Sequence, residues 1–113
     1  MAEESILKTV KKLVNVAPDY DAFDLDIITY INAAFFHLYQ IGVGPQDKPF
    51  TITDGTAKWS DFMQSTDTDA LKSFIGLKVG LLFDPPVNSA VLSSKESLLR
   101  EFEWRLNVYS ETP

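Results

Sequence analysis

The chain has 113 residues, of which 45% are hydrophobic and 23% charged, and this suits one compact domain over residues 1–113 with a core of its own. Cysteine is absent, which excludes disulfides and thiolate metal sites and fits a reducing cytoplasm. The net charge of −6 argues against tight, sequence-independent DNA binding, because such binding needs clustered Lys and Arg.

The N-terminal residues 1–5 are acidic and polar, whereas a signal peptide starts basic and then turns apolar. The longest apolar run, residues 74–83, is too short to span a bilayer and contains Lys78. We therefore expect a soluble protein that is made in the cytoplasm and has no membrane partner.

Two helices are predicted in the N-terminal part of the chain. Apolar residues recur at helical spacing between lysines over Glu3–Val14, and this pattern indicates an amphipathic first helix. The run Asp19–Asp24 offers N-cap residues for a second helix. That helix is expected to end near Gln40, because two glycines follow it.

A short β-hairpin or extended loop is predicted next, over residues 50–59. Phe50 and Ile52 alternate with threonines, an Asp-Gly pair is typical of a type I′ turn, and Trp59 closes the second arm. A single helical turn is then predicted from Trp59 to Met63.

A third main helix is predicted from Thr66 to Phe83. Apolar residues occupy nearly all of its faces, which is typical of a central helix. Gly76 and Gly80 lie four residues apart within it. Each glycine costs roughly 0.5–1 kcal/mol of helix stability relative to alanine, so we expect the pair to permit close approach of a neighbouring helix.

A fourth main helix is predicted to begin at Asn88 or Ser89, after two prolines, and to reach about Tyr109. The expected fold class is therefore mainly α, a small bundle of four main helices with one short β-hairpin or extended loop. The residues predicted to be buried are Ile28, Phe35, Leu77, Leu81, Leu82 and Leu99.

One group of carboxylates resembles a metal site, namely Asp19, Asp21, Asp24 and Asp26. An EF-hand loop needs glycine at its sixth position and glutamate at its twelfth. Counted from Asp19, those positions hold Asp24 and Tyr30, so the match fails. Carboxylates are also favoured at helix N-termini, and we interpret the group as a helix start. No metal site is predicted, and calcium or EDTA should leave the melting temperature unchanged.

The residues needed for catalysis are also not apparent. His37 is the sole histidine, and no serine sits in a G-x-S-x-G elbow. The five glycines are scattered among turns and one helix, which does not fit a phosphate-binding loop. We therefore predict no catalytic residues, no cofactor and no enzymatic activity.

Three stretches, residues 24–32, 77–86 and 101–107, together with the order of the helices and loops, resemble the head–tail connector (adaptor) proteins of long-tailed bacteriophages. The resemblance covers nearly the whole chain, although no single motif is diagnostic. It implies a helical bundle that forms a ring of about a dozen copies beneath the portal. It also implies contacts with the portal and with a stopper or tail-completion protein. The protein would then assemble in the host cytoplasm and reside in the virion, or be encoded by a prophage.

The acidic charge is compatible with this role, because a channel that DNA traverses without specific binding should repel phosphates. A lone hairpin is marginal in water, so Phe50, Ile52 and Trp59 need burial, either on their own domain or against a neighbour. We hypothesise that they reach the adjacent subunit, in a hairpin that orders on assembly. Trp104 and Tyr109 of the last helix would reach the portal or the next ring.

Three alternatives stay open. A small phage regulator of the helix-turn-helix type would need a basic recognition helix, and the most basic stretch, Lys8–Lys12, has only three lysines. An acidic DNA mimic that inhibits a host partner would carry carboxylates along one face, whereas many here sit at helix starts. A stopper or tail-completion protein would usually be richer in strand.

Overall fold

The structure is a computed structural model that describes residues 5–62 and 68–111. It is mainly helical, as the sequence predicts, with four longer helices and one of a single turn. The helices are α1 (Ile6–Leu13), α2 (Asp24–Gln40), α3 (Trp59–Phe62), α4 (Thr68–Phe83) and α5 (Ser89–Glu111). The predicted ends of these elements at Glu3, Met63 and Thr66 lie outside the described residues.

Local sequence signals explain where α1 begins and ends. The Ser5 hydroxyl accepts a hydrogen bond from the Lys8 amide at 3.3 Å, which caps the first turn. Asn15 adopts a left-handed conformation at φ +65°, which asparagine tolerates better than most residues. The chain therefore turns back at this point, and the Val16 amide bonds to the Lys11 carbonyl at 2.7 Å.

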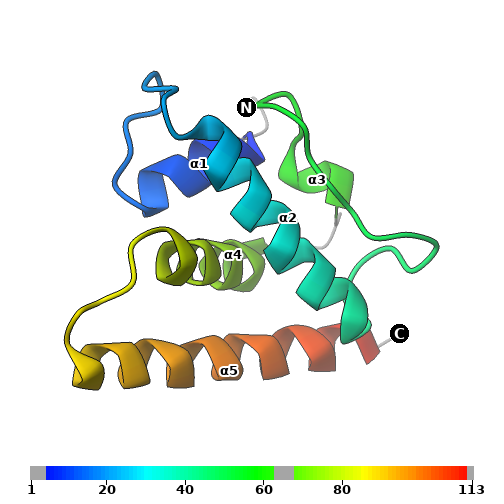
Figure 1. The fold of residues 1–113 in the computed structure, drawn as a ribbon. Helices are drawn as coiled ribbons and strands as arrows, with labels where there is room; N and C mark the ends of the chain where they lie inside the picture. Colours follow the sequence, from blue (N-terminus) through cyan, green and yellow to red (C-terminus); the bar gives the residue numbers. More distant parts are fainter. Residues whose placement is uncertain (1–4, 63–67, 112–113) are drawn as a thin grey trace.

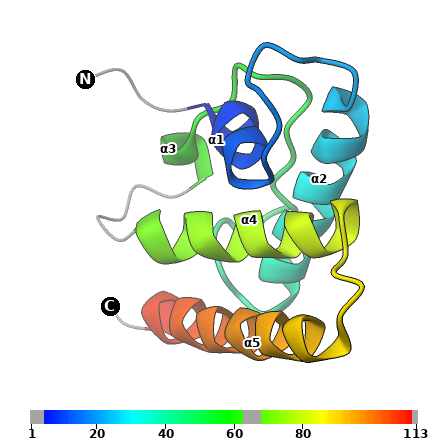
Figure 2. The ribbon, with the colours of Figure 1, turned by 90° about the vertical axis from the view of Figure 1, so that its left-hand side faces the viewer.

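Helix α4 is central, because α1, α2 and α5 all pack against it (Figure 1). A view turned by 90° shows α5 running beneath α4, with no other described element on its far side (Figure 2). The predicted helix boundaries are confirmed here. Helix α4 ends at Phe83, and the Asn88 carboxamide oxygen caps α5 by accepting from the amide of Ala90 at 2.8 Å.

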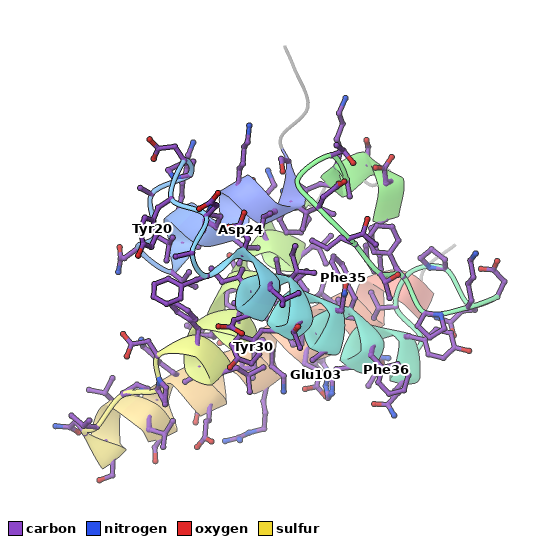
Figure 3. The ribbon with its side chains drawn as sticks, turned by 45° about the horizontal axis from the view of Figure 1, so that its top comes forward. Tyr20, Asp24, Tyr30, Phe35, Phe36 and Glu103 are labelled. Atoms are coloured by element: carbon purple, nitrogen blue, oxygen red, sulfur yellow. The ribbon has the colours of Figure 1, made fainter. Side chains whose placement is uncertain are left out.

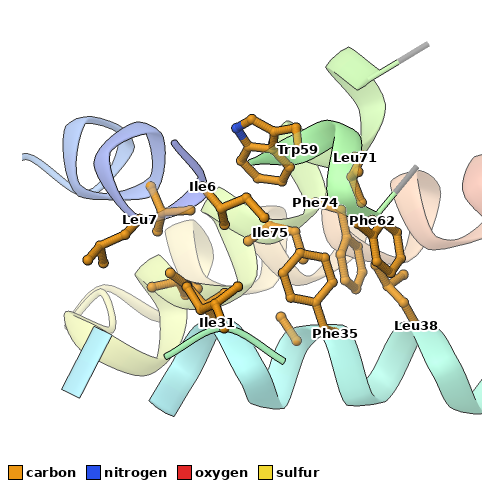
Figure 4. Close-up of a cluster of buried hydrophobic side chains, with 14 of the residues drawn as sticks. Ile6, Leu7, Ile31, Phe35, Leu38, Trp59, Phe62, Leu71, Phe74 and Ile75 are labelled. Carbon is orange, nitrogen blue, oxygen red and sulfur yellow. The ribbon is translucent and has the colours of Figure 1, made fainter. Parts of the chain in front are cut away.

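Aromatic rings fill the middle of the core between α2, α3 and α4 (Figure 4). Phe35 is fully buried, as predicted, and its ring centroid lies 4.6 Å from that of Phe62 and 6.5 Å from that of Trp59. Such tilted arrangements contribute about 0.5–1.5 kcal/mol each beyond the apolar area that they bury. These contacts connect α2 to the short α3.

The close approach predicted at Gly76 is confirmed. A Cβ atom at this position would lie 2.6 Å from Cδ1 and 3.2 Å from Cβ of Leu13, so any larger residue would force the Leu13 side chain of α1 to shift. The packing at Gly80 is looser, since a Cβ atom there would lie 3.7 Å from Cγ1 of Val14, which is ordinary van der Waals contact.

The predicted burial of three leucines on α4 is wrong, although the helix itself is central as predicted. Leu82 is 42% exposed, and Leu77 and Leu81 are only half-buried. Ile28 and Leu99 are also half-buried, and both pack against the edge of the core. The physical reason is that α1 and α5 flank α4 without meeting, which leaves part of its surface open.

The predicted β-hairpin is not formed. Among the described residues the pairing between extended segments is limited to a single bridge between Ser5 and Lys58. Instead, the side chain of Asn32 in α2 bonds to both backbone groups of Ile52: its Oδ1 accepts from the amide at 2.8 Å, and its Nδ2 donates to the carbonyl at 3.0 Å. One side-chain amide thus takes the place of a partner strand, so residues 50–58 form an extended loop. The chain does turn at Asp54-Gly55, but the predicted type I′ turn is wrong, because neither residue has the positive φ that this type requires. The turn is held by the carboxylate of Asp54, which accepts from the Thr56 amide at 2.9 Å.

Candidate interaction surface

Two of the residues predicted to reach a neighbouring subunit lie in the core of their own subunit. Ile52 is 3% exposed and Trp59 is 4% exposed. The indole Nε1 of Trp59 donates to the Thr9 hydroxyl at 3.2 Å. Phe50 is half-buried, and its ring centroid is 4.9 Å from that of Phe35. The expectation of a loose hairpin is therefore wrong, because this segment packs on its own domain.

Trp104, by contrast, is 66% exposed on α5. Val108, one helical turn later, is 40% exposed on the same face. Beside this face, Glu101 and Arg105 form an ion pair at 3.0 Å, so their charges cancel. The side chain of Tyr109, predicted to act together with Trp104, lies outside the described residues.

The gap between α1 and α5 forms an apolar groove on α4 with a volume of about 360 Å³. Gly76 and Gly80, which have no side chains, are part of its lining. A shallower hollow continues it along the first half of α5 and shares Lys95 and Leu98 with it. The residues that line the groove are Leu13, Ser73, Gly76, Leu77, Gly80, Lys95, Leu98 and Phe102.

A second apolar surface lies where α2 begins, and we call Tyr20, Phe23 and Leu25 the aromatic corner. Tyr20 is 52% exposed, Phe23 39% and Leu25 78%. The rings form a packed row, with centroids 5.7 Å apart for Tyr20 and Phe23 and 5.3 Å apart for Phe23 and Phe83. Figure 3 shows Tyr20 near the end of α2 that lies beside α1, and Phe36 toward its other end.

The aspartates next to this corner have different roles. Asp24 forms an ion pair with Lys11 at 2.7 Å, although the contact lacks the alignment of a good hydrogen bond. Lys11 is only 2% exposed, and its Nζ also donates to the Pro18 carbonyl at 3.0 Å. Asp24 therefore fixes α1 to the start of α2. Asp21 and Asp26 stay exposed to solvent. The described residues hold no group of three or more His, Cys, Asp or Glu side chains that could bind a metal ion.

His37 also has a structural role. Its Nε2 lies 3.1 Å from the Glu103 carboxylate, and its ring stacks on Phe74 with centroids 5.9 Å apart. Nearby, the Asn107 side chain donates to the Ile41 carbonyl at 2.7 Å. These contacts fasten the second half of α5 to the end of α2, and they bring no nucleophile to the histidine.

The subunit is helical, has several exposed apolar surfaces, and uses its sole histidine in packing. Comparison with protein families identifies it further. Residues 6–113 match the phage connector protein family, and because the match covers nearly the whole chain, the protein belongs to that family. Comparison with curated proteins and with solved structures finds no match. None of the helices described is long and apolar enough to cross a membrane.

The groove and the aromatic corner were not predicted as sites from the sequence. The spacing of Gly76 and Gly80 indicated a close helix contact but not an open groove beside it. Tyr20 and Phe23 stand within the Asp-rich run that we interpreted only as a helix start. Aromatic residues between exposed aspartates, outside any helical stripe, were the signal that could have indicated a surface patch.

Proposed function

We propose that this connector protein forms a ring beneath the portal, joins the phage head to the tail, and leaves a channel through which DNA passes. The observation that carries the proposal is the match to the connector family over residues 6–113. The exposed apolar faces support it, because a ring subunit must meet both its neighbours and the proteins above and below it. Its partners would be the portal and a stopper or tail-completion protein.

We assign the contact with the portal or the next ring to the exposed face of α5. Trp104 carries this proposal because tryptophan is enriched among the residues that dominate interface energies, and this one is left 66% exposed in the subunit. Tyr109 would extend the same contact. Within the segment 49–59, the part that remains open to a neighbour is Phe50, since Ile52 and Trp59 are buried.

The charge of the protein supports the passage of DNA without specific binding. A net charge of −6 opposes the retention of phosphates on the channel wall, and the repulsion weakens as salt is raised. The subunit would assemble in the host cytoplasm and remain in the virion.

Complementation of a phage that lacks this gene tests the proposal. The wild-type gene should restore infectious particles, and its absence should give filled heads and free tails that do not join. Trp104→Ser should complement poorly although the variant folds, whereas Val87→Ser, at a fully exposed position outside this face, should complement normally. Joined particles in the absence of the gene would show that the protein is not the connector. A protein absent from purified virions would favour the regulator or inhibitor alternative.

A further inference from the structure

We infer that the apolar groove on α4 binds the aromatic corner of a second copy of this chain. The inference rests on the proposed ring and specifies the contact between its subunits. Both surfaces are exposed in the single subunit, both are apolar, and both are formed by residues fixed in the fold.

The two surfaces are separate patches of the subunit: the groove lies along the middle of α4, whereas Phe23 of the aromatic corner packs on Phe83, the last residue of α4. Ser73, Leu77 and Gly80 recur at i, i+4 and i+7, so they share the face of α4 that forms the groove. Leu71 and Ile75 lie on the opposite face and are fully buried. Helix α2 packs against α4, and none of its residues lines the groove. Two different, complementary surfaces on one subunit let copies bind head to tail, and such a contact gives a ring when its rotation closes.

The charges of the two surfaces are complementary. The residues that line the groove include one cation, Lys95, and no carboxylate. Lys12, next to the groove residue Leu13, is exposed as well. The aromatic corner is flanked by the exposed carboxylates of Asp21 and Asp26. Opposite charges across an interface steer the encounter and fix its register, even where each pair adds little affinity.

The shapes are also complementary. Leu25 is 78% exposed on the first turn of α2 and therefore projects from the subunit. Phe23 is held beside it by edge-on contacts with two other rings, so little order has to be gained on binding. The groove is lined largely by apolar side chains, among them Leu13, Leu77 and Leu98, and its volume of about 360 Å³ is large enough for an aliphatic side chain.

The contact can be trapped covalently because the chain has no cysteine of its own. The double variant Leu25→Cys with Leu98→Cys places one thiol on each surface. Mild oxidation of the full-length protein should give a ladder of disulfide-linked oligomers. Each single variant can give at most dimers. The matched control, Leu25→Cys with Val87→Cys, moves the second thiol to a fully exposed position outside the groove and should give no ladder above dimers.

Charge reversal provides an independent readout. Lys95→Glu and Asp21→Lys should each weaken the ladder of the double-cysteine variant by about two- to fivefold, as expected for exposed charges, and the two reversals together should restore it. Trp104→Ser should leave it unchanged. A ladder no stronger than that of the Val87→Cys control would overturn the inference, as would a ladder insensitive to charge reversal. If groove variants block head–tail joining while no ladder forms, the groove binds another connector component, and the inference fails although the proposed function stands.

Discussion

Replacing Asn32 by alanine should loosen the extended loop without disturbing the helices. The Asn32 side chain makes two hydrogen bonds to the backbone of Ile52, at 2.8 and 3.0 Å. Each such bond contributes about 0.5–1.5 kcal/mol to stability, so their joint loss should lower the free energy of unfolding by about 1–3 kcal/mol. Alanine has a higher helix propensity than asparagine, by up to about 0.7 kcal/mol, which would mask part of this loss.

Thr29→Ala is the matched control, because Thr29 lies on the same helix, is exposed, and bonds only to the Leu25 carbonyl at 2.9 Å. It shares the gain in helix propensity but leaves the loop untouched. Urea denaturation of the two variants should therefore differ by about 1–3 kcal/mol. Hydrogen exchange gives the local readout: the Ile52 amide should exchange roughly 5- to 150-fold faster in Asn32→Ala. Equal stabilities, together with unchanged exchange at Ile52, would refute the reasoning that this side chain replaces a partner strand.

Three further predictions follow from the same structure. Lys11→Ala should lower the free energy of unfolding by about 2–3 kcal/mol in urea titrations. This is less than the roughly 3–5 kcal/mol expected for a fully buried ion pair, because the partner carboxylate, that of Asp24, is 31% exposed. A loss below about 0.5 kcal/mol would contradict a structural ion pair. Ile75→Ala should cost about 2–5 kcal/mol and Leu82→Ala under about 1 kcal/mol, and equal losses would place α4 differently. Hydrogen bonds from the side chain and then the backbone of Thr56 lower the pKa of Asp54. The stability that these bonds contribute is therefore present above the ordinary aspartate pKa, and it is lost as the pH falls through the lowered pKa of the folded state. NMR titration should show this pKa moving back toward its ordinary value in Thr56→Ala.

The sequence predicted the helices well because their limits depend on nearby residues. Ser5 and Asn88 cap helices through their own side chains, and the two prolines after Phe83 stop α4. Trp104 was placed correctly away from the core, because it falls off the stripe formed by Phe102 and Leu106. These are short-range relations, and the period of the helix is enough to determine them.

The errors arose where a distant residue decides the outcome. The alternation of residues 50–53 is typical of a strand, but Asn32, twenty positions upstream, satisfies the backbone that a second strand would have paired. Leu82 has the same apolar character as the buried Leu71, yet only the placement of α1 and α5 decides which of them is covered. Surfaces such as the groove depend on that placement too, so neither the pattern nor the composition reveals them.

The two halves of helix α5 are held to the rest of the subunit to different degrees. Its second half is held by Leu106, which is buried, and by two polar contacts. Glu103 pairs with His37 of α2, and Asn107 donates to the carbonyl of Ile41, the residue after α2. From Ser89 to Leu98 none of its side chains is fully buried, which leaves roughly 15 Å of helix at 1.5 Å per residue more lightly supported. A sideways load on this half would rotate the helix about its second half, so that a small tilt there becomes a larger displacement at Ser89. How far this half of α5 can tilt is therefore limited mainly by the contacts of its second half.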